Sequence, residues 1–297
     1  MAHIALKVDV DTLRGTLEGV PRLLRLLERR GLKATFLFSL GPDHTGWALK
    51  RVFRPGFLSK VARTSVLKHY GLRTLLYGVL LPAPDIGRRA TGPMRDCRRA
   101  GHECGLHTWD HVVWQDNVRS RSAAWTQGQM SLAYDRFGEI FGEAPATHGA
   151  AGWQMNEHAL RQIDAWGMPY ASDSRGDGPF RPVVGGQVLR HVQWPTTLPT
   201  FDELIGTEGI DEANVHRALM RRTEDDHDHV FTLHAELEGG LFASAFEALV
   251  EGWYAQGHRL GALSDVHQAL GAAPLPQRPL TWGQMPGRSG EMVVVRA

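Results

Sequence analysis

Two carboxylates stand close together near the start of the chain, in the stretch KVDVDT at residues 7–12. Side chains at positions i and i+2 of a β-strand point to the same face, so a strand here places Asp9 and Asp11 side by side. Neighbouring anions repel, and the repulsion is relieved when one of them is protonated or a cation joins them. The stretch therefore predicts a site in which one aspartate binds a cation while the other stays close by as a base.

His107 and His111 in GLHTWDH are the residues that could complete such a cation site. Their spacing puts them one turn apart on a helix, so both imidazoles can reach a single ion. Two histidines and one carboxylate, here Asp11, suit Zn²⁺ or a neighbouring divalent ion and leave positions open for water or substrate. The spacing alone is a weak signal, because the chain has 15 histidines and some pairs at this spacing arise by chance.

Further polar residues follow predicted strands later in the chain: HGAAGWQ at 148–154, Asp173 and Arg175 in SDSRG, and His234 in TLHAE. Active-site groups of α/β barrels lie at the C-terminal ends of the strands, so these residues are expected to meet at one mouth. Simpler interpretations exist: the two aspartates could cap the following helix, and DDHDH at 225–229 is typical of a solvated loop. The combination, in this order, favours an active site.

The elements that must position these residues alternate along the chain. The strand IALKVDV is followed by TLEGVPRLLRLLERRG, whose leucines recur at helical spacing, and then by the strand KATFLFSLG. Strand, helix and strand in this order begin a βαβ unit. The same rhythm predicts helices at 122–142, 211–223 and 241–256, and strands in GHECGLHTW, MPYASDSRG and HVFTLHAEL. The sequence therefore predicts an α/β fold, with one closed or nearly closed barrel spanning 1–297 as a single domain.

Residues 44–84 form an exception to this rhythm, because they contain no Asp or Glu. Aromatic and aliphatic residues alternate there with seven cations, namely Lys50, Arg51, Arg54, Lys60, Arg63, Lys68 and Arg73. The apolar run at the end is shorter than the ~20 residues that a membrane-spanning helix needs. The pattern fits a segment lying in the headgroup region of an anionic membrane, and it fits equally an insertion that packs on the barrel with a solvated basic face.

Composition restricts the class of protein. With 297 residues, 42% hydrophobic and 22% charged, the chain is typical of a globular protein. The net charge of +1 argues against a surface built for nucleic acid. Cys97 and Cys104 match neither a zinc or redox spacing nor a disulfide framework. The apolar strand begins too early for a secretory signal, so we expect a cytoplasmic protein.

Five stretches of the chain resemble the motifs of a known enzyme superfamily. The stretches KVDVDT, HTWDH, AAGWQ, SDSRG and TLHAE, in this order, resemble the five motifs of the polysaccharide deacetylase (NodB-homology, carbohydrate esterase 4) superfamily. Nearly the whole chain, including DVDTLRGTLEGVPRLL, PFRP and TLPTFDE, resembles more closely its branch of deformylases acting on a formamido-arabinose carried by undecaprenyl phosphate. The resemblance implies a distorted NodB-type (β/α)7 barrel with an amphipathic insertion at about 44–84.

The resemblance also implies roles for single residues. Asp9 matches the general base; Asp11, His107 and His111 match the metal ligands; His234 matches the general acid; and Asp173 matches the carboxylate that orients it. The superfamily commonly has an arginine in its third motif that steadies the base, whereas the matching position here is Ala150, and Arg175 is the candidate replacement. A backbone N–H around Gly152 and Trp153 is the candidate oxyanion donor.

The function implied is metal-dependent hydrolysis of the formamide, which releases formate and leaves 4-amino-4-deoxy-L-arabinose on its lipid carrier for lipid A modification and polymyxin resistance. The implied location is the inner face of the cytoplasmic membrane, with Lys50, Arg51, Arg54, Lys60, Arg63 and Arg73 contacting anionic lipid. The residues alone do not distinguish Zn²⁺ from Mn²⁺, Co²⁺ or Ni²⁺. They also leave open a deacetylase of other N-acyl sugars, because the one methyl group by which acetyl differs from formyl gives only ~1–3 kcal/mol of discrimination. A metal- or lipid-binding module without activity is the other alternative.

Overall fold

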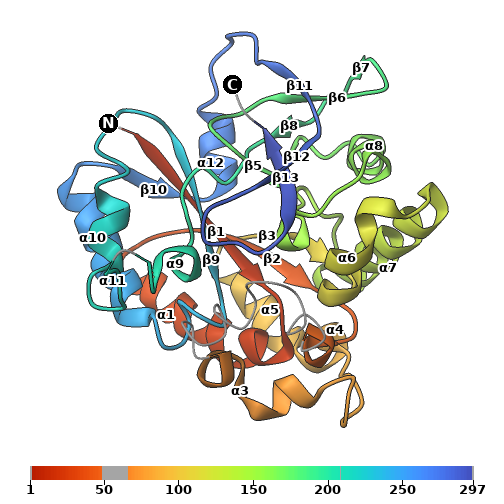
Figure 1. Cartoon of the computed structure of the whole chain (residues 1–297), viewed down its shortest axis with the longest axis horizontal. Coiled ribbons are helices and arrows are strands. Elements are labelled where there is room, and N and C mark those ends of the chain that lie inside the picture. Colours follow the sequence, from red (N-terminus) through yellow and green to blue (C-terminus); the bar gives the residue numbers. More distant parts are fainter. Residues whose placement is uncertain (1, 49–65, 208, 296–297) are drawn as a thin grey trace.

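The computed structural model describes residues 2–48, 66–207 and 209–295, with side chains described from residue 71 onward after the first gap. Its centre is a parallel sheet in which β1 (His3–Val10) pairs with β2 (Thr35–Ser39), β9 (His229–His234) and β10 (Arg259–Gly261), and β2 pairs with β3 (Glu103–Thr108). Every residue of β1 after His3 is buried, as expected for a strand covered on both faces. The predicted strands of the βαβ opening are confirmed (Figure 1).

Backbone hydrogen bonds link β3 to β9 through the segments that lie between them in the barrel. Leu106 of β3 forms a parallel bridge with His148, and the Ser172 N–H donates to the His148 carbonyl. β4 (Tyr170–Ala171) pairs in parallel with β8 (Val192–Gln193), and the Thr197 N–H then donates to the Val230 carbonyl of β9. The pairing returns to β1 through short and irregular contacts. The predicted distorted α/β barrel is therefore confirmed.

Helices surround these strands (Figure 1). In α1, four apolar residues at helical spacing, Val20, Leu23, Leu26 and Leu27, are buried against the core. The predicted helices at 122–142, 211–223 and 241–256 are present, the second shorter than expected. The helical segments are η1 (Gly15–Gly19), α1 (Val20–Arg29), α3 (Val66–Leu76), α4 (Ile86–Arg89), α5 (Thr91–Arg99), α6 (His111–Asn117), η3 (Val118–Ser120), α7 (Ala123–Phe141), η4 (Ala151–Trp153), α8 (Glu157–Ala165), α9 (Phe201–Leu204), α10 (Val215–Met220), α11 (Ala243–Ala255) and α12 (Leu263–Gln268).

Two small sheets of short strands were not predicted from the alternation of strands and helices along the sequence. β13 (Glu291–Val295) pairs antiparallel with β12 (Thr281–Gln284) and in parallel with β5 (Arg175–Gly176). β6 (Arg181–Val184) pairs with β7 (Gln187–Val188) and β11 (Gln277–Pro279). Met292 and Val294 of β13 form a small apolar cluster with Trp153. The C-terminal strand therefore supports the loop that carries Trp153.

Candidate active site

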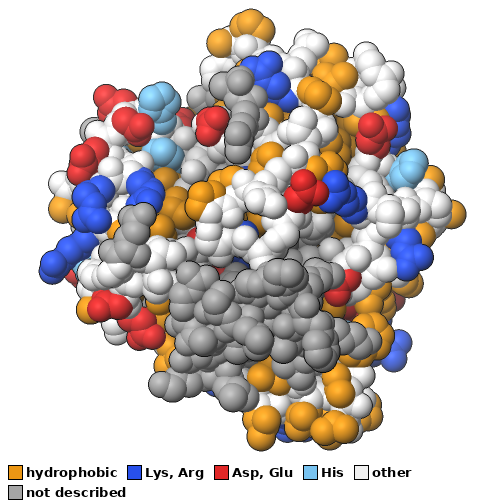
Figure 2. Space-filling view, viewed as in Figure 1, with side chains coloured by type: hydrophobic (Ala, Val, Ile, Leu, Met, Phe, Trp, Pro, Cys, Tyr) orange, Lys and Arg blue, Asp and Glu red, His pale blue; other side chains and the backbone are white. Residues whose placement is uncertain are grey.

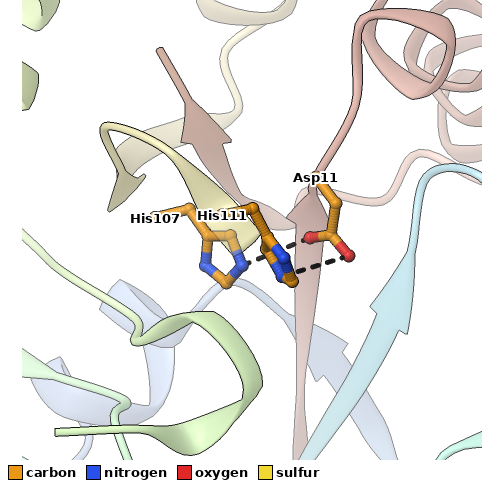
Figure 3. A group of neighbouring side chains, drawn as sticks. All are labelled: Asp11, His107 and His111. Atoms are coloured by element: carbon orange, nitrogen blue, oxygen red, sulfur yellow. Dashed lines mark ion pairs between the residues drawn. The ribbon is translucent and has the colours of Figure 1, made fainter. Parts of the chain in front are cut away.

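Asp11, His107 and His111 form a cluster at the mouth of the barrel (Figure 3). Asp11 Oδ1 lies 3.2 Å from His107 Nε2, and Asp11 Oδ2 lies 3.4 Å from His111 Nε2. Asp11 follows β1, His107 lies in β3, and His111 begins α6, whose first turn is capped by the Asp110 side chain accepting from the Val113 N–H. Two strand ends and one capped helix thus bring together residues nearly a hundred positions apart.

The donor set fits a divalent cation. His107 Nδ1 lies 2.6 Å from the Gly149 carbonyl oxygen, to which it donates, so Nε2 is the ring nitrogen that faces Asp11 and that a cation would use. Both His107 Nε2 and Asp11 Oδ1 are buried, and neither has a hydrogen-bond partner within the described residues. Burial by itself raises the pKa of Asp11, but His111 and His107 hold that pKa well below its usual range. The cluster therefore presents an ionised carboxylate and imidazole nitrogens to one point.

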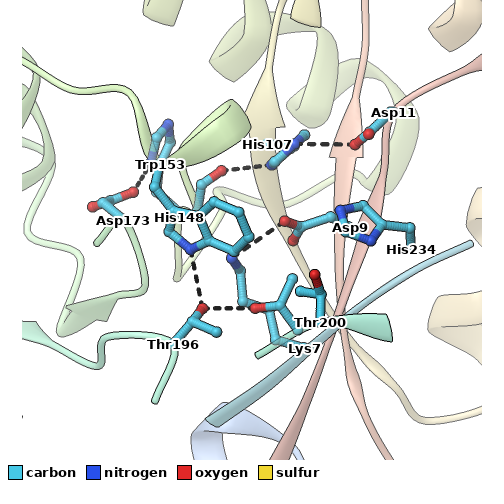
Figure 4. A network of polar contacts seen from close by, with 12 residues as sticks. Lys7, Asp9, Asp11, His107, His148, Trp153, Asp173, Thr196, Thr200 and His234 are labelled. Atoms are coloured by element: carbon cyan, nitrogen blue, oxygen red, sulfur yellow. Dashed lines mark hydrogen bonds and ion pairs between the residues drawn. The ribbon is translucent and has the colours of Figure 1, made fainter. Parts of the chain in front are cut away.

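Asp9 is paired with a lysine that the sequence analysis did not single out. Lys7 Nζ lies 3.3 Å from Asp9 Oδ2, and the Lys7 side chain is fully buried (Figure 4). The same ammonium lies 5.5 Å from the ring centre of Trp153. Asp9 Oδ1 is buried without a hydrogen-bond partner among the described residues. The signal was in the sequence, because Lys7 precedes Asp9 by two positions and so shares its face of β1.

His234 lies at the end of β9, directly beside Asp9 in the strand register. Neighbouring residues in register point to the same face, so both side chains leave the sheet on the Asp9 side. The His234 N–H donates to Glu238 Oε2 at 2.7 Å, while its ring Nδ1 is buried and lacks a hydrogen-bond partner in the described chain. His234 also helps to lower the pKa of Asp11, which places it within electrostatic reach of the metal cluster.

Asp173 does not orient His234, so this expectation is wrong. Its Oδ1 lies 2.6 Å from His148 Nδ1, and its Oδ2 accepts from Gln193 Nε2 at 2.6 Å. The reason lies in the strand order: Asp173 follows β4, which neighbours the segment of His148 and β8, whereas His234 ends β9 beside β1. His148 is a site residue that the sequence analysis noted only within HGAAGWQ.

Arg175 is not the replacement for the motif-three arginine. Its guanidinium donates to Glu203 Oε1 at 2.7 Å and to the carbonyls of Thr196 and Leu198, and it lies 4.9 Å from the Trp153 ring centre. Asp9 is not among these partners of the Arg175 side chain. The cation beside Asp9 is Lys7 instead, and Ala150 at the matching position is buried and apolar.

The loop of Gly152 and Trp153 has a constrained backbone. Gly152 has a φ of 60°, and Trp153 is a non-glycine residue with a φ of 54°. The Trp153 N–H donates to the Ala150 carbonyl, and the indole Nε1–H donates to Thr196 Oγ1 at 3.1 Å. Both donors of Trp153 are therefore occupied, which is contrary to the expectation that its N–H stabilises an oxyanion. For Gly152 the expectation stays a prediction.

Two buried carboxylates lie next to the site. Glu236 Oε1 accepts from the N–H groups of Asp11 and Thr12, and burial together with nearby Asp11 raises the pKa of Glu236 to about 8. Burial also raises the pKa of Glu238 to about 8. These residues fix the backbone around Asp11 and His234 and were not predicted from the sequence.

The predicted lipid-contacting residues lie largely outside the described residues, namely Lys50, Arg51, Arg54, Lys60 and Arg63. Arg73 is described and exposed on α3. Exposed apolar side chains stand nearby: Leu72 and Leu80 are 67% and 75% exposed, and Val79 is also exposed. Hydrophobic side chains gather at this lower edge of the molecule in Figure 2, below the grey atoms. None of the described helices is long and apolar enough to span a bilayer.

Solved structures define the class of protein. No protein-family model matches the chain. A protein of Mycobacterium smegmatis assigned as a polysaccharide deacetylase has a TM-score of 0.64 at 19% sequence identity, covering 96% of this chain and 95% of that one. A protein of Pseudomonas aeruginosa with the same assignment has a TM-score of 0.58 at 15% identity, covering 90% of both chains. The chain therefore has the polysaccharide deacetylase fold.

Curated relatives define the family within that class. A protein of Shewanella sediminis assigned as the 4-deoxy-4-formamido-L-arabinose-phosphoundecaprenol deformylase ArnD is 37% identical over 250 residues, which is 84% of this chain and 81% of that protein. A protein of Wigglesworthia glossinidia brevipalpis with the same assignment is 31% identical over 278 residues, or 93% and 96% of the two chains. The chain belongs to the ArnD deformylase family.

Proposed function

We propose that this chain, as one catalytic domain spanning 1–297, removes the formyl group from 4-deoxy-4-formamido-L-arabinose carried by undecaprenyl phosphate. The observation that carries the proposal is the cluster of Asp11, His107 and His111 beside Asp9 and His234 at one mouth. The proposal is supported by residues that could hold a cation, a candidate base and a candidate acid in one region of a member of the ArnD family. Hydrolysis of the amide yields formate and a free 4-amino group on the sugar.

The chain's own residues divide the chemistry. A divalent ion held by Asp11, His107 and His111 would polarise the formyl carbonyl and lower the pKa of a water molecule. Asp9 Oδ1, which has no hydrogen-bond partner in the described chain, accepts the proton of the attacking water. Lys7 holds Asp9 Oδ2, which keeps Oδ1 turned to the reacting groups.

His234 acts on the other side of the reaction. As the C–N bond breaks, its imidazolium donates a proton to the departing nitrogen, and the sugar leaves as the amine. The buried ring of His234 is anchored through its backbone, where its N–H donates to Glu238. The proton that Asp9 gained returns to His234 through solvent, and formic acid gives its proton to the amine. The balance at neutral pH is therefore water plus formamide giving formate and the protonated amine.

The test is mass spectrometry of the formylated lipid incubated with purified protein, with and without added Zn²⁺, Mn²⁺, Co²⁺ or Ni²⁺. We expect a mass loss of one formyl group only when metal is present, and a much slower loss from the N-acetyl analogue. Equal conversion in the presence of a strong chelator would refute the metal-dependent mechanism, and faster conversion of the acetyl analogue would refute the deformylase.

We also propose that residues 44–84 hold the enzyme on the inner face of the cytoplasmic membrane. Two features support this: seven cations without an acidic residue in this stretch, and the exposed side chains of Leu72, Val79 and Leu80 beside Arg73. Each cation near an anionic surface contributes roughly 1 kcal/mol, and apolar burial adds a part that salt does not screen.

Sedimentation with anionic vesicles tests the membrane proposal. Replacing Lys50, Arg51, Arg54 and Lys60 by Gln, or Leu72 and Leu80 by Ser, should weaken binding while metal content stays unchanged. High salt should release the wild type only in part. If both variants sediment like wild type, the segment is a packed insertion with a solvated basic face.

A further inference from the structure

A cleft beside the metal cluster has no role in the proposed reaction. Its volume is about 140 Å³, and it opens between the segment after β1 and the loop after β9. These are the two strands that carry Asp9 and His234. The residues lining the cleft are Arg14, Gly15, Glu18, Gly19, Arg22, Ala235, Glu236, Gly239, Gly240 and Leu241.

Glycines allow the two walls to approach each other closely. A Cβ added at Gly19 would stand 2.0 Å from the Ala235 carbonyl oxygen, and one at Gly15 would stand 1.8 Å from Glu236 Oε1. Residues with side chains at these positions would force the walls apart. The close approach of the two walls therefore requires glycine at both positions.

One side chain separates the cleft from the metal cluster. Glu236 lines the cleft, and its Oε1 accepts from the N–H groups of Asp11 and Thr12 at 3.1 Å and 2.9 Å and from Thr12 Oγ1 at 2.8 Å. This carboxylate oxygen is thus committed to donors on the β1 side. A ligand in the cleft therefore lies one side chain away from the backbone of Asp11.

The charge of the remaining lining residues favours an anion. Arg14 is paired with Glu18 at 3.2 Å, whereas Arg22 is exposed and forms no ion pair with any described residue. Leu241 in the wall of the cleft is 51% exposed. A cation next to an exposed apolar side chain suits a ligand that joins an anionic group to a hydrocarbon chain.

The orientation of the substrate in the active site determines which part of it lies at the cleft. The nitrogen that leaves must face His234, so the sugar that bears it lies on the His234 side of the metal cluster. The cleft opens on this side, since the loop 235–241 that forms one wall directly follows His234. The phosphate of the lipid-linked sugar is one sugar ring away from that nitrogen.

We propose that this cleft is the sugar-phosphate subsite, in which Arg22 binds the phosphate and the prenyl chain leaves over Leu241. The inference rests on the proposed function, because the substrate's orientation follows from the role of His234. The exit also leads toward the insertion: a Cβ added at Gly71 of α3 would stand 2.8 Å from Arg14 Nη1, so Arg14 lies directly against α3. The lipid would pass from the cleft to the segment that we place on the membrane.

Binding of geranyl phosphate, measured by calorimetry without membranes, tests the subsite apart from turnover. We expect Arg22→Gln to weaken binding by about 10-fold, as expected for loss of a charge-assisted hydrogen bond, and Leu241→Ser to weaken geranyl phosphate binding but not that of inorganic phosphate. Arg25→Gln, an exposed arginine on the same helix, is the matched control and should bind like wild type. Equal affinity of wild type and Arg22→Gln, or no binding by wild type, overturns the subsite.

Kinetics separate this inference from the proposed function. With a short-chain prenyl-phosphate substrate, Arg22→Gln should raise KM about 10-fold and leave kcat within twofold, while a methyl glycoside of the same formamido-sugar should be unaffected. If geranyl phosphate binds as expected but no formamide is hydrolysed, the proposed function fails and the anion site stands. If Arg22→Gln lowers only vesicle sedimentation, the cleft binds lipid headgroups and the subsite is wrong.

Discussion

Replacing Lys7 by Met tests whether the buried lysine positions Asp9. The change keeps a side chain of similar length and removes the charge that lies 3.3 Å from Asp9 Oδ2. At this distance the attraction between unit charges is roughly 5 kcal/mol at an effective dielectric constant of 20. The desolvation of a fully buried ammonium offsets part of it. If about half is offset, roughly 2.5 kcal/mol remains, which corresponds to a factor of about 10² in rate.

We therefore expect Lys7→Met to lower kcat about 100-fold while KM stays within about threefold and metal content is unchanged. Formate release measured with a coupled dehydrogenase gives kcat, and elemental analysis after dialysis gives the metal. Lys33→Met, a lysine at the other end of the barrel whose ammonium donates to the Ala100 carbonyl, is the matched control. Turnover of Lys7→Met within threefold of wild type would refute the role.

A second variant separates positioning from a merely structural role. The resemblance matches Ala150 to the arginine that steadies the base in the wider superfamily, so an arginine at position 150 is expected to bring a charge toward Asp9 when Lys7 is replaced. The double variant Lys7→Met/Ala150→Arg should recover part of kcat, because it returns a charge to Asp9 from another strand. A purely structural lysine would not be rescued in this way.

The other residues of the site lead to three further predictions. Asp11→Ala and His107→Ala should lose both metal and activity, and an alanine variant that keeps a full equivalent of metal after dialysis would contradict the assignment. Asp9→Asn and His234→Ala should keep metal and lose turnover ~10²- to 10⁴-fold, the usual contribution of a general base or acid, which single-turnover assays would measure. Glu238 has its folded-state pKa raised to about 8, above its value in the unfolded chain, so between about pH 4.5 and 8 the folded state binds the extra proton and stability falls as pH rises. Glu238→Gln should remove this loss of stability with rising pH, which is at most about 1.4 kcal/mol per pH unit. Urea unfolding at pH 5, 6.5 and 8 measures the free energy of unfolding, and the same dependence on pH in both proteins would contradict the prediction.

The strands and the metal cluster could be predicted because their signals are local. Buried parallel strands are short, largely apolar runs, and β1, β2 and β9 each contain such a run. The spacing of His107 and His111, and the strand-end position of Asp11, brought the three side chains together as expected. Each of these inferences needs only the period of a strand or a helix and the rule that strand ends share one edge.

The partners of Asp173 and Arg175 could not be predicted, because they depend on the strand order around the barrel. Both residues end a predicted strand, but the pairing of Asp173 with His148 follows from which segment lies next to β4. Arg175 is held by Glu203 in α9, and strand β13 from the C-terminus packs on Trp153 beside it. Motif order along the chain indicates which residues reach the mouth, and only the three-dimensional neighbours decide which of them touch.

The face of β1 that carries Lys7 and Asp9, with Asp11 directly after the strand, explains how two neighbouring aspartates acquire different roles. Lys7 reaches one residue along this face and pairs with Asp9, whose charge it compensates. Asp11, one step further toward the mouth, is beyond β1 and faces His107 and His111 instead. Asp11 therefore faces two imidazoles that could bind a cation together with it, while Asp9 keeps one oxygen on Lys7 and the other without a hydrogen-bond partner in the described chain. Lys7 supplies from β1 itself the positive charge that the arginine of the wider superfamily is expected to supply from the position matching Ala150, and this is a physical reason for the alanine there.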